Sequence, residues 1–202
     1  MVKEPVDMLS KSRIEALTDS LFATVMTILV LSLVVPIIIT GSNTNILLIS
    51  SIISMLPGIL VYVTSFIILG VIWIEHNNIF RYVHEVDNRT QWITIFFLLS
   101  VGIIPFSTAF LGRYPLQQPA IILYSINFII IALMFKLIAY HVMHYQKKRN
   151  IRRISRAARS TSISLIIYAI AIPVSYLNSY ISLGLFVIVP AYYIISGLRN
   201  PS

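Results

Sequence analysis

The side chains whose types and spacing are most suggestive of a function lie between Arg13 and Pro36. This stretch opens with charged residues and then stays apolar for about the 20 residues that a helix needs to cross a bilayer. Within its apolar part, a row of small hydroxyl side chains recurs at helical intervals, which places the row on one side of a helix. The row consists of the hydroxyl residues Ser20, Thr24 and Thr27 and continues at the same spacing to Leu31, with Ile28 at its edge.

Two interpretations of this row follow from helical spacing. Small hydroxyl side chains let transmembrane helices approach closely, so the row can be a packing face between helices. Alternatively, the row lines a wetted path that Ile28 and Leu31 close with apolar side chains.

Acids, bases and metal ligands elsewhere in the sequence give no support to catalysis. His141 and His144 can share one helix face, but a metal site needs three or four ligands and no carboxylate lies near them in the sequence. The remaining candidate pairs are Glu75 with His76 and His84 with Glu85. No H-E-x-x-H, G-x-S-x-G or glycine-rich phosphate loop occurs. We therefore predict that the protein is not an enzyme, with no catalytic residue, metal site or cofactor.

Composition predicts an integral membrane protein. Hydrophobic residues make up 57% of the 202 residues and charged residues only 11%, whereas about a quarter of a soluble domain is charged. The absence of cysteine excludes disulfides and cysteine-ligated metals.

Apolar segments predict an all-α protein with six transmembrane helices per subunit. The expected spans are at about 14–39, 46–80, 91–111, 119–145, 160–177 and 181–198. Residues 1–13 form a cytoplasmic lead-in, residues 14–198 the membrane domain, and residues 199–202 a cytoplasmic tail. Pro57 and Pro105 should bend the second and third spans.

The net charge of +8 arises from basic residues that are clustered along the chain. Such clustering in one loop is typical of membrane topology and argues against nucleic-acid binding. All seven acidic residues lie at or before Asp87, and a basic cluster lies between Lys147 and Arg159. Only Arg113 falls in a loop on the opposite side, so the positive-inside rule predicts cytoplasmic termini in a multi-pass plasma-membrane protein. The basic cluster could attract anionic lipids or serve only as a solvated topology anchor.

Three short motifs in this order resemble the transmembrane protein 175 family of potassium channels, in its single-repeat prokaryotic form. The family opens with R-x-x-x-F-S-D, and this chain has R-x-x-x-L-T-D. The segment G-V-I-W-I-E-H-N-N-I-F is similar to the family's tryptophan-x-x-histidine segment, and N-R-T-Q-W followed by I-P-F-S-T gives the third match. The residues that carry the resemblance are Arg13, Leu17, Thr18, Asp19, Trp73, His76, Phe80, Asn88, Pro105, Phe106, Ser107 and Thr108.

The resemblance implies a homotetramer in the lipid bilayer whose first helix lines a central pore for potassium ions. It places Thr24, Thr27, Ile28 and Leu31 on the pore face, with hydrophobic rings forming a gate, as in a potassium-preferring leak channel. It also implies a network at the cytoplasmic end, formed by Arg13, Thr18, Asp19, Trp73, His76 and Asn77. The alternative is a secondary transporter or lipid-handling membrane protein that uses the same helix face for packing.

One position departs from the family. Members commonly have a bulky aliphatic residue five positions after the motif aspartate, where this chain has Thr24. We expect Thr24 to shift the dry seal outward to Ile28 and Leu31, which would give leakier closure or weaker potassium selectivity.

Overall fold

The computed structural model describes residues 10–34, 37, 44–83, 86–145 and 151–199, and these contain helices but no strand. The elements are α1 (Lys11–Leu29), the short 3-10 helix η1 (Val30–Ser32), α2 (Thr44–Phe80), α3 (Asn88–Gly102), α4 (Ile104–Arg113), α5 (Gln118–Tyr145), α6 (Ile151–Leu177) and α7 (Ser179–Arg199). The predicted all-helical fold class is confirmed. The basic cluster between Lys147 and Arg159 falls partly outside the described residues and partly on the start of α6, where only the backbone is described.

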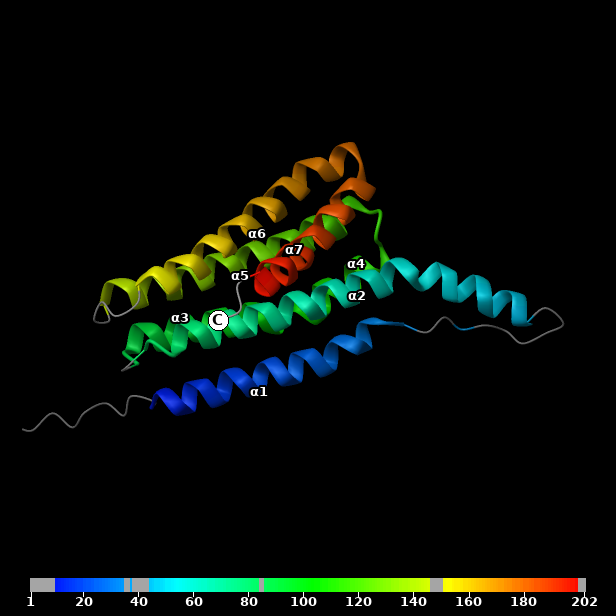
Figure 1. The fold of residues 1–202 in the computed structure, drawn as a ribbon. Helices are drawn as coiled ribbons and strands as arrows, with labels where there is room; N and C mark the ends of the chain where they lie inside the picture. The colour runs from blue at the N-terminus through cyan, green and yellow to red at the C-terminus, as the bar shows by residue number, and fades with distance from the viewer. Residues whose placement is uncertain (1–9, 35–36, 38–43, 84–85, 146–150, 200–202) are drawn as a thin grey trace, which may run out of the picture.

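The helices form a layered bundle with α1 along one edge and α6 along the opposite edge (Figure 1). α1 packs on α2, α3 and α4, whereas α6 packs mainly on α5 and α7. Between the outer helices, α5 contacts α3 and α4 on one side and α6 on the other, so it backs the layer on which α1 rests.

Four helical segments have the length and apolar composition to cross a membrane, and two shorter apolar helices follow them. The long segments are Lys11–Ser32, Thr44–Phe80, Asn88–Arg113 and Gln118–His144, and the shorter ones are Thr161–Leu177 and Ser179–Ile195. These six segments agree with the six helices expected from the sequence.

Two spans differ in detail from the sequence expectation. The first was expected to continue to about residue 39, but its α-helix ends at Leu29, η1 ends at Ser32, and Leu33 is extended. Val34 is β-branched and so disfavours helical backbone at this point. Residues 35, 36, 38 and 39 of the expected span lie outside the described residues. The third span divides at Ile103 into α3 and α4, with Pro105 in the first turn of α4, where its missing N–H costs nothing.

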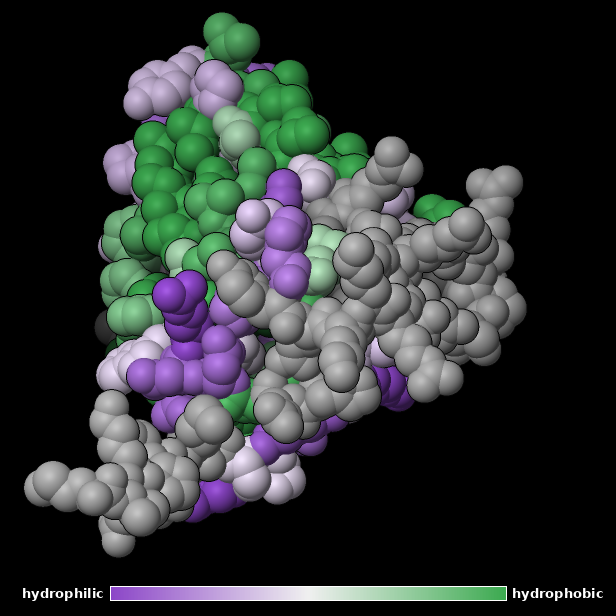
Figure 2. Space-filling model, turned by 90° about the vertical axis from the view of Figure 1, so that its left-hand side faces the viewer, coloured by the Kyte–Doolittle hydropathy of each residue, from purple (hydrophilic) through white to green (hydrophobic). Residues whose placement is uncertain are grey.

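The bundle has two distinct ends. We call the near end the one where α1 begins, α2 ends and α3 begins, and the far end the one where α4 is followed by α5 and α6 by α7 (Figure 1). Figure 2 views the near end, where hydrophilic side chains gather beside a hydrophobic flank.

Asp87 organises the near end by capping α3 and contacting α5. Its carboxylate accepts hydrogen bonds from the Thr90 backbone N–H at 2.9 Å and from the Thr90 hydroxyl. Nε2 of His141 lies 3.1 and 3.2 Å from the two carboxylate oxygens. Although partial burial raises the pKa of the Asp87 carboxyl, the bonds from Thr90 and His141 outweigh it and lower that pKa below its ordinary value.

α2 and α4 cross at a pair of glycines. A Cβ added to Gly58 would lie 3.3 Å from the carbonyl oxygen of Gly112, and a Cβ added to Gly112 would lie 3.4 Å from Cα of Gly58. The two backbones therefore lie close together. Small residues commonly allow such close approach between membrane helices. Pro57 adjoins the crossing, and α2 changes direction along its length in Figure 1.

We predict that Gly58→Val destabilises the fold by about 1–3 kcal/mol, because two methyl groups must be forced between the backbones of α2 and α4. Thermal unfolding in detergent micelles measures the effect. Gly102→Val is the matched control, since a Cβ at Gly102 meets no heavy atom within 4 Å. Equal unfolding temperatures for the two variants would show that the crossing is not tightly packed.

Candidate functional site

α1 has one face buried in the bundle. The residues on this face are Ile14, Thr18, Phe22, Val25 and Leu29. The ring of Phe22 lies 6.2 Å from that of Phe97 on α3, and Cε of Met26 lies 3.8 Å from the Cβ position of Gly70 on α2. These contacts fix the rotation of α1 about its own axis, so its opposite face points in a defined direction.

The opposite face carries the row found by helical spacing. Ser20, Thr24 and Thr27 are all exposed, as are Ile28 at 44% and Leu31 at 73%. No other helix among the described residues covers this face, because α1 contacts only α2, α3, α4 and η1. The packing interpretation therefore finds no partner for these side chains within the described part of the subunit.

The hydroxyl hydrogens of the row are all used on the helix itself. The Ser20, Thr24 and Thr27 hydroxyls donate to the carbonyl oxygens of Ala16, Ser20 and Thr24, each at 2.8 Å. A hydroxyl has one hydrogen and two lone pairs, so what remains for a solute is an acceptor oxygen. Lone pairs of this kind can accept a hydrogen bond from water or contact a cation.

Leu31 belongs to the tighter winding of η1. Because a 3-10 helix has three residues per turn, the α-helical stagger of the row ends at Leu29. Ile28 and Leu31 are three residues apart, so they lie on a common side of this last turn and form the apolar end of the row.

The structure brings some of the expected near-end network together. Nε1 of Trp73 on α2 donates to Oδ1 of Asp19 on α1 at 2.8 Å, which ties the two helices. Thr18 is buried, and its hydroxyl donates to the carbonyl of Ile14 at 2.9 Å. Arg13 is exposed and forms no ion pair with the described residues, and Asn77 is half-buried.

His76 takes no part in this hydrogen bond, although it lies within electrostatic reach of Asp19. Its ring is buried between Phe80 and Phe97, with centroids 4.3 and 5.2 Å away and nearly parallel planes. Neither ring nitrogen forms a hydrogen bond with the described part of the chain. His76 therefore contributes an aromatic contact between α2 and α3.

A buried polar chain in the bundle core was not predicted from the sequence. The Thr108 hydroxyl donates to Oγ of Ser65 at 2.9 Å, and that oxygen lies 2.9 Å from the Tyr124 hydroxyl. Beside it, Nδ2 of Asn127 donates to Oγ of Ser107 at 3.0 Å. These bonds join α2, α4 and α5. The matched I-P-F-S-T segment and the polar residues inside otherwise apolar spans were the available signals.

No group of three or more metal-ligating side chains lies together within the residues that the structure describes. The geometry instead presents a helix face of acceptor oxygens and apolar side chains.

Comparisons with known proteins show what this arrangement is similar to. A family model described as "Endosomal/lysosomal potassium channel TMEM175" matches residues 13–105. Potassium channel HX13_20290 from Chryseobacterium sp. is 27% identical, over 95% of this chain and 96% of its own length. Potassium channel Cha6605_3372 from Chamaesiphon minutus is 28% identical over 96% and 97% of the two chains.

A solved structure matches along nearly the whole chain. The crystal structure of a lysosomal potassium-selective channel TMEM175 homolog from Chamaesiphon minutus superposes with a TM-score of 0.81 at 27% identity, covering 95% of this chain and 98% of that one. This chain is similar to TMEM175 potassium channels along nearly its whole length. A second structure, of a MtTMEM175 variant, shares the fold at 15% identity and a TM-score of 0.59.

These matches to TMEM175 channels confirm the resemblance carried by the three motifs. They also confirm that the chain is a membrane protein and not an enzyme, since the matching relatives are named as channels. The alternative of a transporter or lipid-handling protein receives no support from these relatives.

We predict that Trp73→Phe destabilises the protein by about 1 kcal/mol, because the hydrogen bond to Asp19 is lost while the aromatic contact area is largely kept. Thermal unfolding in micelles measures the loss. Trp92→Phe is the matched control, since Trp92 is an exposed tryptophan on α3.

A double-mutant cycle tests whether the effect passes through the hydrogen bond. In an Asp19→Ala background, Trp73→Phe should add little further destabilisation. Fully additive effects would contradict a direct coupling of α1 to α2 through this pair.

Proposed function

We propose that four copies of the chain form a homotetrameric, potassium-preferring cation channel in which α1 lines the central pore. The observation that carries the proposal is the one-sided packing of α1, whose exposed face combines acceptor oxygens with an apolar end. Around a fourfold axis, these faces would meet, and each residue of the row would form a ring.

Conduction would be passive and would select by dehydration. Rings of Ile28 and Leu31 make an apolar neck, in which a cation loses part of its hydration shell. Potassium is larger and less strongly hydrated than sodium, so the partial loss of its hydration shell in the neck costs less free energy. On one side of the neck, the hydroxyl oxygens of Thr24 and Thr27 would replace part of the lost water by coordinating each potassium ion as it passes.

Side chains carry selectivity in this proposal because the sequence contains no T-V-G-Y-G segment from which a ring of backbone carbonyls could form. The names of the relatives support the same function, since they are potassium channels of similar length.

Charge distribution supports a plasma-membrane orientation with the near end in the cytoplasm. Both chain termini would then be cytoplasmic, and the basic cluster between Lys147 and Arg159 would face that leaflet and its anionic lipids. The bond between Asp19 and Trp73 would hold the cytoplasmic ends of α1 and α2 together, close to the pore entrance.

The proposal predicts a potassium-selective current in a planar bilayer with potassium chloride on one side and sodium chloride on the other. The reversal potential should lie well toward the potassium equilibrium potential, and Leu31→Ser should raise the conductance by wetting the neck. Leu99→Ser is the control, because Leu99 is an exposed leucine on α3. Folded protein that passes no current under varied voltage and pH would contradict the proposal.

Thr24→Leu restores the bulky aliphatic residue that the family commonly has at this position. We expect a several-fold lower conductance and a reversal potential closer to that of potassium, because a second apolar ring lengthens the dry part of the pore. Thr24→Val separates size from hydroxyl chemistry, since it keeps the shape and removes the oxygen. Unchanged conductance and ion preference in Thr24→Leu would place Thr24 outside the pore.

A further inference from the structure

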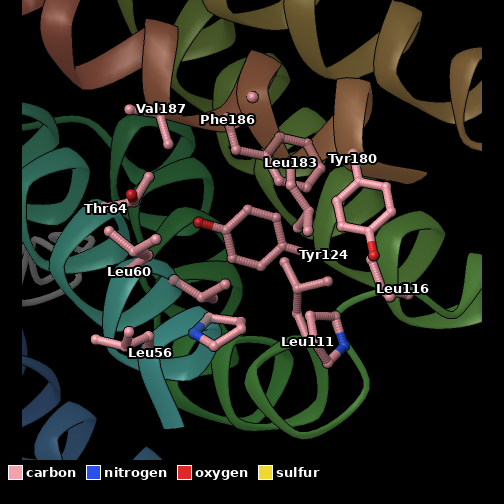
Figure 3. A pocket seen from close by; sticks show the side chains of 14 residues that line it. Leu56, Leu60, Thr64, Leu111, Leu116, Tyr124, Tyr180, Leu183, Phe186 and Val187 are labelled. Atoms are coloured by element: carbon pink, nitrogen blue, oxygen red, sulfur yellow. The ribbon is translucent and has the colours of Figure 1, made fainter. Parts of the chain in front are cut away.

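A cavity of about 450 Å³ opens at the far end of the bundle, between α2, α4, α5 and α7. This volume lies within the range of pockets that bind small organic ligands. Figure 3 shows Tyr124 between side chains of α2, such as Leu60, and the side chains of Leu183 and Phe186 on α7. We call this cavity the far-end groove.

The walls of the far-end groove are almost entirely apolar. The hydroxyl of Tyr124 already lies 2.9 Å from Oγ of Ser65, so its ring forms the wall. Thr64 and Tyr180 are the other lining residues that carry a hydroxyl. Water in such a groove would lack the two to four polar partners that buried water needs. The occupant must therefore be apolar where it contacts these walls.

Two contacts lie at the rim of the groove. The Ser179 hydroxyl at the start of α7 donates to the carbonyl of Leu116 at 2.9 Å, which ties α7 to the connection between α4 and α5. On the other side, α2 contains Pro57 and crosses α4 at Gly58. These two contacts fix the positions of α7 and α2 relative to α4 and the connection that follows it.

The surface around the groove is also apolar and exposed. Leu56 and Leu60 on α2 and Val187 on α7 are each more than two-fifths exposed, and Tyr180 is 70% exposed. α7 has no contact with α1. If α1 lines the proposed pore, the α7 side of the subunit faces outward, where the surrounding medium is lipid chains.

A cationic residue, Arg113, lies two residues before Pro115, which lines the groove. Arg113 ends α4, is exposed and forms no ion pair with the described residues. Pro115 and Leu116, which follow it, line the groove. Among the described residues of the far end, Arg113 is the sole charged side chain, and a guanidinium binds phosphate oxygens well.

We propose that the far-end groove binds one phospholipid from the leaflet at that end, with an acyl chain along the apolar walls and the phosphate at Arg113. Tyr114 and Tyr180 flank the headgroup region, where amphipathic aromatic side chains are favoured. The outward direction of the groove rests on the proposed function, whereas its apolar walls and the charge of Arg113 do not.

Gly184 on α7 offers a direct way to fill the groove. It lines the cavity, and a Cβ added there meets no heavy atom within 4 Å. A phenylalanine side chain at this position therefore enters open space without moving the backbone. Gly102→Phe is the matched control, because its Cβ position is equally open and it does not line the groove.

Native mass spectrometry of the purified, delipidated assembly, titrated with phosphatidylglycerol, measures lipid binding. We expect Gly184→Phe to weaken the tightest binding step at least tenfold and Gly102→Phe to leave it unchanged. Arg113→Gln should weaken the binding of phosphatidylglycerol several-fold and leave the binding of a neutral diacylglycerol unchanged, since only the phosphate contact is lost.

Two results would overturn the proposal. Equal lipid binding by the Gly184→Phe and Gly102→Phe variants would show that the groove is not the site. Loss of the native assembly in Gly184→Phe alone would show that a second copy of the chain covers it. Because the readout is bound lipid and not current, a failed pore proposal remains distinguishable: lipid would still bind while the bilayer measurement shows no potassium current.

Discussion

The structure depends on the fact that α1 is packed on one face only. Phe22 and Leu29 are fully enclosed by α2, α3 and α4, and this layer is in turn backed by α5. The rotation of α1 is thereby fixed, and its hydroxyl row is directed away from the rest of the subunit. If α1 were not packed on one face, it would have no preferred rotation in lipid. Its hydroxyl row would then point in no fixed direction.

The buried hydrogen bonds of the core give the bundle a cohesion that apolar packing alone does not supply in a membrane. Lipid chains solvate leucine as well as a neighbouring helix does, so van der Waals fit and polar contacts must hold the helices together. Ser65, Thr108 and Tyr124 link three helices at one depth. The glycine crossing of α2 and α4 adds close backbone contact on the same pair of helices.

The sequence predicts the number and approximate positions of the helices because a membrane span requires a long apolar run. It also predicts the common side of Thr24 and Thr27, since helical spacing alone determines it. It predicts a bend at Pro105, but it does not predict that the third span divides into two helices at Ile103 or that Leu31 lies in a 3-10 turn, because both depend on local backbone conformation. The stacking of His76 between two phenylalanines depends on α3, which no local pattern in α2 reveals.

α2 is longer than a single crossing of the bilayer requires. With 37 residues, it extends about 55 Å at 1.5 Å per residue, far more than the roughly 30 Å of a bilayer's hydrocarbon core. Part of α2 must therefore tilt, lie along the interface or extend beyond the hydrocarbon core. The first half of α2 meets α4 at Gly58, and α4 contacts α1, so the orientation of the start of α2 is tied to the helices that support α1.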